Sequence, residues 1–172
     1  MSSHPEKDAS ERSEPTALSG LTTSTCYLDL VESRTSIHTN HKSQRILSKD
    51  HDKVGLSGEF AFGEFSGLWP DTRSLEGGDC GVDFTVGLGF TVDVKTYRKP
   101  GNLIHEQGKP FADIFVLAKY DDETGKSELL GWEWGAILRK APVRDFGYGV
   151  INHYIPAKDL RPMETLSKRF VR

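Results

Sequence analysis

Two aspartates and a lysine, Asp83, Asp93 and Lys95, have residue types and a spacing that suit metal-dependent hydrolysis of a phosphodiester. Hydrolysis of this bond requires shielding of the phosphate charge, activation of a water molecule, and stabilisation of the charge that builds at phosphorus. Mg²⁺ can do all three, and it prefers oxygen ligands such as carboxylates, waters and substrate phosphates. We therefore expect Asp83 and Asp93 to bind Mg²⁺, for which Mn²⁺ can substitute, with the main-chain carbonyl of Val94 as a further ligand.

Lys95 lies two residues after Asp93, so on a strand both side chains project to the same side. Its ammonium could orient the attacking water or offset the charge that builds on the phosphoryl oxygens. The sequence leaves both roles open.

A hairpin would bring these side chains together. Residues 82–86 alternate as a strand does, and residues 90–96 alternate again, with Asp93 and Lys95 on the face opposite the apolar residues. The intervening Gly87-Leu88-Gly89 suits a tight reversal, because glycine adopts positive φ without steric cost.

The stretch 53–67 is predicted to be a helix, with Leu56, Phe60 and Gly63 on one stripe. Glycine costs roughly 0.5–1 kcal/mol relative to alanine inside a helix, so several glycines suggest a close backbone approach to another element. We expect this helix to pack on the hairpin and to offer Glu59 to the site. The alternative is an ordinary amphipathic helix in which Glu59 and Glu64 are both solvated.

These residues, in this order, resemble the PD-(D/E)XK nuclease superfamily of phage and bacterial enzymes. The resemblance rests on Gly58-Glu59, on Gly-Val-Asp83-Phe and on Asp93-Val-Lys95, and it covers residues 53–138. It implies that Asp83 and Asp93 bind the metal, that Lys95 serves the catalytic water, and that Glu59 is an accessory acid. The chain departs from the usual pattern at Val82, where proline is common, and in using aspartate rather than glutamate before the lysine.

The resemblance also implies a restriction-endonuclease-like α+β fold of the α/β sandwich type. Such a core has a helix with an acidic residue, a β-meander, and then a further helix and strand, with helices flanking a mixed sheet of four to five strands. The remaining pattern predicts strands at 112–120, 127–138 and 150–155, polar turns or loops at 97–109, 121–126 and 139–149, and a helix at 156–166.

Basic and aromatic residues supply candidates for contact with a nucleic acid. Arg98 and Lys99 follow the proposed catalytic lysine, and Lys140 belongs to a basic group with Arg139 and Arg144. We expect Arg98, Lys99 and Lys140 to bind substrate phosphates, although such residues are often simply solvated. Trp132 and Trp134 suit either base stacking or core packing, and core packing is favoured.

Composition limits the class of protein. The chain has 172 residues, of which 27% are charged and 36% hydrophobic, and a formal charge of -3. Residues 1–25 have the composition of a disordered tail, so we expect one domain over residues 26–172. No apolar run approaches the roughly 20 residues that cross a bilayer, and the two cysteines match no zinc or disulfide framework. We therefore expect a cytoplasmic protein without a membrane partner.

Together these features predict a Mg²⁺-dependent nuclease that hydrolyses DNA, in phage or bacterial recombination, repair or processing. Two alternatives remain open. The first is a catalytically inactive protein of the same fold that binds nucleic acid or a protein partner. The second is a module unrelated to nucleic acid, in which Asp93 and Lys95 form an internal salt bridge. Cleavage of both duplex strands would suit a homodimer, for which the sequence shows no interface signature.

Overall fold

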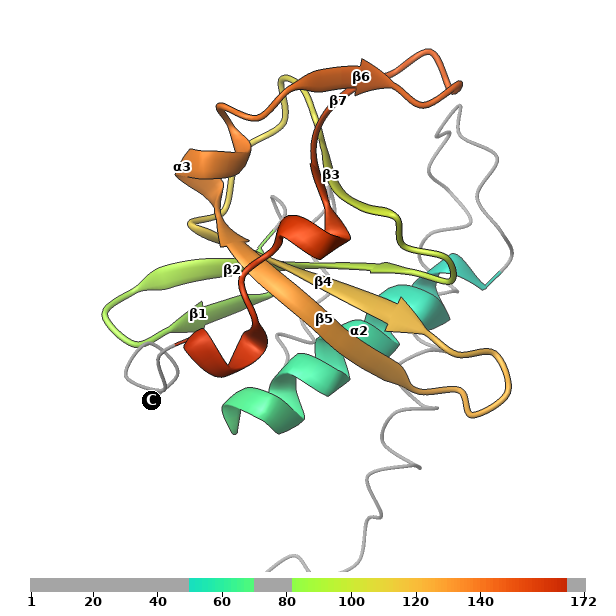
Figure 1. Cartoon of the computed structure of the whole chain (residues 1–172). Coiled ribbons are helices and arrows are strands. Elements are labelled where there is room, and N and C mark those ends of the chain that lie inside the picture. Colours follow the sequence, from blue (N-terminus) through green and yellow to red (C-terminus); the bar gives the residue numbers. More distant parts are fainter. Residues whose placement is uncertain (1–49, 70–81, 167–172) are drawn as a thin grey trace, which may run out of the picture.

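The computed structural model describes residues 50–69 and 82–166 as one long helix and two sheets (Figure 1). The helices and strands are α2 (His51–Ser66), β1 (Phe84–Val86), β2 (Phe90–Tyr97), β3 (Asn102–Glu106), β4 (Ile114–Tyr120), β5 (Ser127–Trp134), α3 (Gly135–Leu138), β6 (Val143–Asp145) and β7 (Ile151–Pro156), followed by two 3₁₀ turns, η1 (Ala157–Asp159) and η2 (Met163–Thr165). The α+β class expected from the sequence is confirmed.

The larger sheet has the strand order β1-β2-β4-β5. Strands β1 and β2 form an antiparallel hairpin, β2 runs parallel to β4, and β4 runs antiparallel to β5. The hairpin reverses at Gly87 and Gly89, whose φ angles are 50° and 96°, as the glycine spacing predicted. The expected mixed sheet is therefore present, with four strands.

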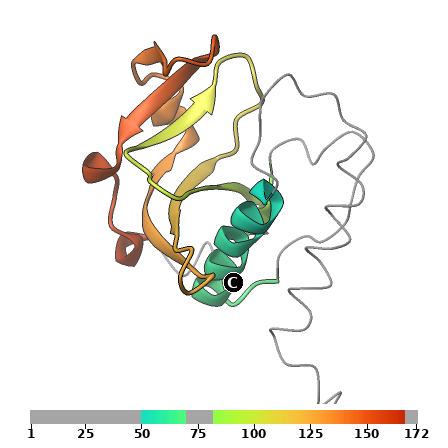
Figure 2. The same cartoon turned by 90° about the vertical axis from the view of Figure 1, so that its right-hand side faces the viewer.

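Helix α2 lies against one face of the larger sheet (Figure 2). Phe62 of the helix shares a buried cluster with Val92 and Val94 of β2. At Gly58 a β-carbon would overlap the Thr96 hydroxyl, so glycine lets the helix backbone approach β2 closely. The close approach expected from the glycines is thus present at Gly58, whereas a β-carbon at Gly55 would meet nothing within 4 Å.

The second sheet covers the opposite face and has the strand order β3-β7-β6. Phe115 and Leu117 of β4 pack there with Leu103 of β3, Leu138 of α3 and Ile155 of β7. The sequence predicted helices on both sides of the central sheet. On this side most of the covering layer is instead a sheet.

The connection from β2 to β4 also differs from the implied nuclease core. The resemblance implies a helix between these parallel strands, and the sequence suggested only polar turns at 97–109. The structure has the strand β3 there, which pairs with β7. Only Leu103 and His105 are buried in this strand, so its apolar pattern was too short to detect.

Three predicted elements near the C-terminus were wrong. The strand expected at 127–138 ends at Trp134, because the chain turns into α3 there and Gly135 lies against the carbonyl of Ala112. The loop expected at 139–149 contains β6. The helix expected at 156–166 is replaced by η1 and η2, since Pro162 lacks an N–H and prevents continuous helical hydrogen bonding.

Some expectations concern residues outside the described ranges, namely the tail at 1–25, the following segment to residue 49, and both cysteines. Within 50–69 and 82–166, no helix is long and apolar enough to cross a membrane.

Candidate metal and phosphate site

Asp83 is hydrogen-bonded to Val92 and Val94, the two chain neighbours of Asp93. Its N–H donates to the carbonyl of Val92 at 2.8 Å, and its carboxylate Oδ2 accepts from the N–H of Val94 at 2.6 Å. Asp83 directly precedes β1, whose first residue, Phe84, is paired with Val92. Neighbouring strands lie about 4.8 Å apart, so the two aspartates occupy adjacent positions across one strand gap. The hairpin therefore brings together the two carboxylates that the sequence selected.

The main-chain N–H and C=O groups of Val94 are directed toward the side of β2 on which Asp83 lies. In an extended strand, the N–H and C=O of one residue point to the same side within the sheet plane. Because the N–H of Val94 bonds to Asp83, its carbonyl is directed to the side where β1 begins. This orientation suits the expected role of Val94 as a main-chain metal ligand.

Asp93 and Lys95 form a close ion pair on the face of β2 opposite α2. Lys95 Nζ lies 2.7 Å from Asp93 Oδ2, and the two side chains are 29% and 4% exposed. Val92 and Val94 face α2, so the alternation of the strand directs Asp93 and Lys95 to the other side. The lysine is thus the more solvent-accessible member of a largely buried pair.

Glu59 reaches the site from α2. Its side chain is buried, and its charge acts directly on Asp83. Glu64, the other acid considered on this helix, is exposed. Glu59 approaches from the helix side of the sheet, and its accessory role stays a prediction.

The surroundings of Asp83 disfavour its ionised form. Desolvation is the largest cause that raises the pKa of its carboxyl well above the usual value, and the charges of Glu59 and Asp93 raise it further. The hydrogen bond from Val94 and the charge of Lys95 act in the opposite direction and are weaker. Carboxylates crowded in this way are stabilised by a bound cation.

The donor set fits Mg²⁺. Two carboxylates and one carbonyl are hard oxygen ligands, and Mg²⁺ commonly binds one or two carboxylates while waters and phosphate complete its shell. Among the described residues, no group of three or more His, Cys, Asp or Glu side chains surrounds a common metal position. An ion here would therefore rest on Asp83, Asp93 and Val94, with its other positions open to water and substrate.

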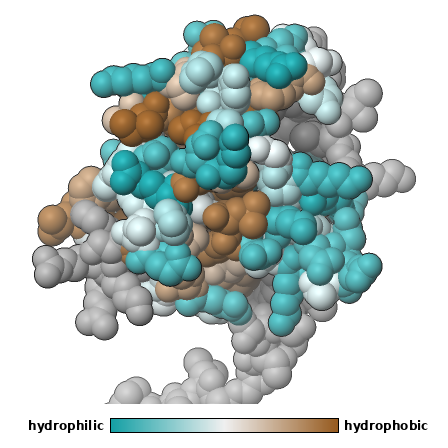
Figure 3. All heavy atoms as spheres, viewed as in Figure 1, coloured by the Kyte–Doolittle hydropathy of each residue, from teal (hydrophilic) through white to brown (hydrophobic). Residues whose placement is uncertain are grey.

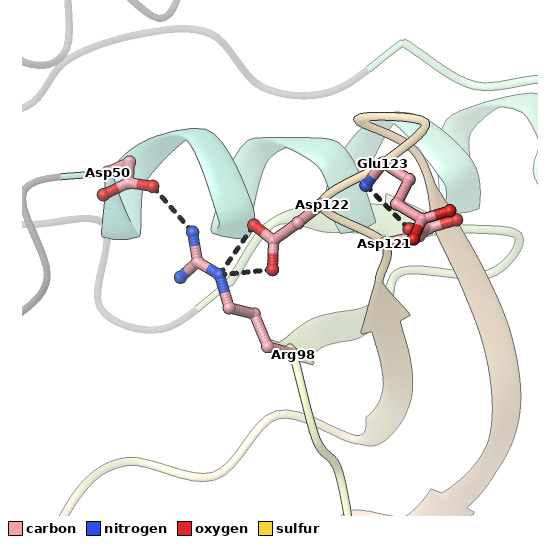
Figure 4. A network of polar contacts seen from close by, with 5 residues as sticks. All are labelled: Asp50, Arg98, Asp121, Asp122 and Glu123. Atoms are coloured by element: carbon pink, nitrogen blue, oxygen red, sulfur yellow. Dashed lines mark hydrogen bonds and ion pairs between the residues drawn. The ribbon is translucent and has the colours of Figure 1, made fainter.

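Arg98 belongs to a separate ion-pair network just beyond β2 (Figure 4). Its Nη2 lies 2.6 Å from Asp50 at the start of α2, and its Nε lies 2.9 Å from Asp122 in the β4–β5 turn. These carboxylates, Asp122 first, raise the pKa of the guanidinium. A phosphate at Arg98 would have to compete with both of them.

The other two predicted phosphate-binding residues are solvent-exposed. Lys99 directly follows Arg98 after β2, whereas Lys140 follows α3 in another part of the fold. Trp132 is buried, and its indole N–H donates to Pro162 O and Thr165 Oγ1, which identifies it as a core residue.

His105 is a site neighbour that sequence reasoning missed. It is buried on β3 against Phe111 and Phe115, and its Nε2 lies 3.5 Å from the carbonyl of Lys109. Burial is the main cause that lowers its pKa, and the charge of Lys95 lowers it further. The buried positions of β3 alternate, but a single strand of five residues carries too little signal to place it beside β2.

No family model, curated protein or solved structure matches this chain. The candidate site therefore depends on its own geometry.

Proposed function

We propose that this protein is a Mg²⁺-dependent nuclease that hydrolyses DNA phosphodiesters, in recombination, repair or processing of phage or bacterial DNA. Asp83, Asp93 and the Val94 carbonyl bind the ion, which supplies charge neutralisation at the scissile phosphate. Lys95 binds the attacking water or the phosphoryl oxygens, and Glu59 sets the charge around Asp83. The proposal includes a cytoplasmic location.

The observation that carries this proposal is the pair of hydrogen bonds that join Asp83 to Val92 and Val94, the chain neighbours of Asp93. Two hydrogen bonds hold one carboxylate beside another, although desolvation and two negative charges oppose its ionisation. An arrangement that is electrostatically unfavourable in the protein alone is typical of sites built for a charged ligand.

The finer fold assignment is part of the same proposal. The order α2, β1, β2 and β4, with Glu59 on the helix and Asp93-x-Lys95 on β2, supports a restriction-endonuclease-like core. In this interpretation β3 replaces the helix that usually joins the two parallel strands.

The proposal is tested with a panel of labelled substrates: single strands, flaps, junctions and duplexes of DNA, and the matching RNA forms. Each is incubated with the protein in Mg²⁺, Mn²⁺ or EDTA. We expect cleavage of at least one DNA form with either metal and none with EDTA. Absence of cleavage for every form and metal, or undiminished cleavage in EDTA, contradicts the proposal. If a duplex is among the substrates cut, analytical ultracentrifugation of the protein with that duplex measures the mass of the complex and tests for a homodimer.

One observation favours a second candidate, a module in which the charges are structural. The Asp93–Lys95 contact of 2.7 Å is the internal salt bridge that this alternative requires. It gives no reason for placing Asp83 beside Asp93 and a buried Glu59 near Asp83, since further carboxylates weaken a buried pair. If the wild-type protein cuts nothing in the substrate panel, and the double change Asp93→Asn with Lys95→Met lowers the stability of the protein, the structural role is correct.

A further inference from the structure

A basic loop belongs to the second sheet and is distant in sequence from the proposed metal ligands. It comprises residues 139–149 and includes β6. Its three cations, Arg139, Lys140 and Arg144, are all exposed, and its only carboxylate is Asp145. The whole chain has a formal charge of -3, so this loop is a local concentration of positive charge.

Tyr148 stands at the tip of this basic loop and is 82% exposed. Among the exposed large hydrophobic residues in the described ranges, only Leu88 is more exposed, at 92%, and it is aliphatic. Val143 and Ile151 beside it are also exposed. Figure 3 shows apolar residues at the upper edge of the drawn face, where Figure 1 places β6 and β7.

Hydrogen bonds within the loop fix the backbone at Tyr148. The Oδ1 of Asp145 accepts hydrogen bonds from the N–H groups of Gly147, Tyr148 and Gly149 at 2.8, 3.0 and 3.2 Å. These bonds lower the pKa of the Asp145 carboxyl, so it stays ionised and directed into its own backbone. A side chain displayed on a preorganised loop loses little entropy when a ligand binds.

Aromatic and cationic groups alternate beside Tyr148. The guanidinium carbon of Arg144 lies 5.6 Å from the ring centre of Phe146, and Phe146 packs edge-on against Tyr154. An exposed aromatic ring on the same loop as three exposed cations matches the chemistry of a nucleic acid strand, in which flat bases alternate with phosphates. A protein partner would use the ring equally well but would leave the three cations without a matching charge.

We propose that the basic loop binds a single strand of nucleic acid, with an unpaired base stacked on Tyr148 and phosphates bound by Arg144 and Lys140. This inference rests on the proposed nuclease function and specifies its substrate as one with a single-stranded segment. It gives Tyr148 the stacking role that the sequence had considered for Trp132 and Trp134.

The loop lies within reach of the metal site. On the second sheet, His105 of β3 is paired with His153 of β7, which is paired with Val143 of β6. Two strand spacings amount to about 10 Å, and His105 senses the charges of Asp93 and Lys95. The β6 part of the basic loop is thus about two strand spacings from His105, and we expect a strand of several nucleotides to extend from there toward the metal site.

The test measures binding of the full chain to fluorescein-labelled single-stranded oligonucleotides in EDTA, by fluorescence anisotropy. DNA and RNA strands are separate arms, with a blunt duplex as comparison. The variants are Tyr148→Ala, Tyr148→Trp, Arg144→Gln and, as a matched exposed apolar control, Leu88→Ala. Thermal unfolding of each variant checks that its fold is intact.

Because stacking on one aromatic side chain is lost, Tyr148→Ala should bind about fivefold or more weakly, while Tyr148→Trp and Leu88→Ala stay within about twofold of the wild type. Arg144→Gln should lower the slope of binding against salt by about one ion. Unchanged affinity of Tyr148→Ala, or wild-type binding to duplex alone, overturns this inference but leaves the nuclease proposal standing if the panel is cut. Wild-type protein that neither binds nor cuts any form overturns both.

Discussion

Asp83 is hydrogen-bonded to both chain neighbours of Asp93, through the Val92 carbonyl at 2.8 Å and the Val94 N–H at 2.6 Å. This double attachment places Asp83 opposite Asp93 where β1 begins. Each residue of the site then has a consequence that can be measured separately.

Asp93→Ala and Lys95→Ala should each lower the rate of DNA cleavage by at least about 100-fold, because each removes a group that acts on the developing charge. Single-turnover rates with a labelled substrate measure the effect. The control is Lys119→Ala, which removes an exposed lysine from the neighbouring strand β4. Full activity in Asp93→Ala, with its fold intact by circular dichroism, would remove Asp93 from the mechanism.

Asp83→Asn should stabilise the metal-free protein at neutral pH. The pKa of Asp83 is raised in the folded state, so the unfolded chain loses this proton first and the free energy of unfolding falls as the pH rises from 3.8 through the folded pKa. The neutral amide removes this cost while keeping an oxygen for the Val94 N–H. We expect the melting temperature in EDTA to rise by about 2 °C or more, the shift that ~1 kcal/mol produces in a domain of this size.

The same Asp83→Asn variant should lose the rise in melting temperature that Mg²⁺ or Mn²⁺ gives the wild type, because a ligand that binds only the folded state stabilises it. Lower stability in EDTA, together with an undiminished response to metal, would show that Asp83 is a structural acid.

His105 should make the protein less stable in acid. Its pKa is lowered from 6.5 in the folded state, mainly by burial, so below about pH 6.5 the unfolded chain takes up a proton that the folded protein resists. The stabilisation is present above that pH and is lost as the pH falls. The free energy of urea unfolding at pH 8 and pH 5 measures this difference.

His105→Gln should flatten the pH dependence. His153→Gln, a change in its partner on β7, should leave most of the slope attributable to His105 in place, because the charge of His153 is the smallest of the causes that lower the His105 pKa. An identical slope in wild type and His105→Gln would show that other groups govern acid stability.

Gly58→Ala should destabilise the protein by about 1–3 kcal/mol, the usual cost of overpacking, because the new methyl group overlaps the Thr96 hydroxyl. Gly55→Ala, in the same helix but with open space around it, should stabilise by about 0.5–1 kcal/mol. Urea unfolding compares the two.

The double variant Gly58→Ala with Thr96→Ala should recover part of the loss, since the two sites share one contact. If Gly58→Ala is as stable as Gly55→Ala, the helix does not press on β2 at this point.

Where local pattern and tertiary environment agree, the fold could be predicted from the sequence. The stripe of apolar residues predicted α2 at 53–67, and the helix spans His51–Ser66. The strands predicted at 90–96 and 112–120 match β2 and β4 within two residues at each end. The first shows an alternation of apolar and polar residues, and the second is a nearly continuous apolar run.

The second sheet could not be predicted in this way. Strand β6 has three residues, all exposed, and β3 has only two buried positions, so neither shows a usable period. The pairing of β3 with β7 joins segments about 50 residues apart, which tertiary packing decides, whereas β6 pairs with β7 as a local hairpin whose first strand is too short to detect. The same limit applies to His105, which becomes a neighbour of Lys95 only through that packing.

For the candidate site, the sequence indicated which side chains share a face of β2, but not which residues from other elements would bind them. The alternation of the strand predicted Asp93 and Lys95 on one face of β2, and the ion pair between them is consistent with that placement. The sequence did not indicate that Arg98 would be held by Asp50 and Asp122, because both partners come from other elements.

The most direct test of the metal site is anomalous diffraction from crystals of the protein soaked in Mn²⁺. We expect one strong peak within coordination distance of a carboxylate oxygen of Asp83, one of Asp93 and the carbonyl of Val94. Absence of a peak at these oxygens, with Lys95 still bound to Asp93 at a saturating Mn²⁺ concentration, would contradict the account.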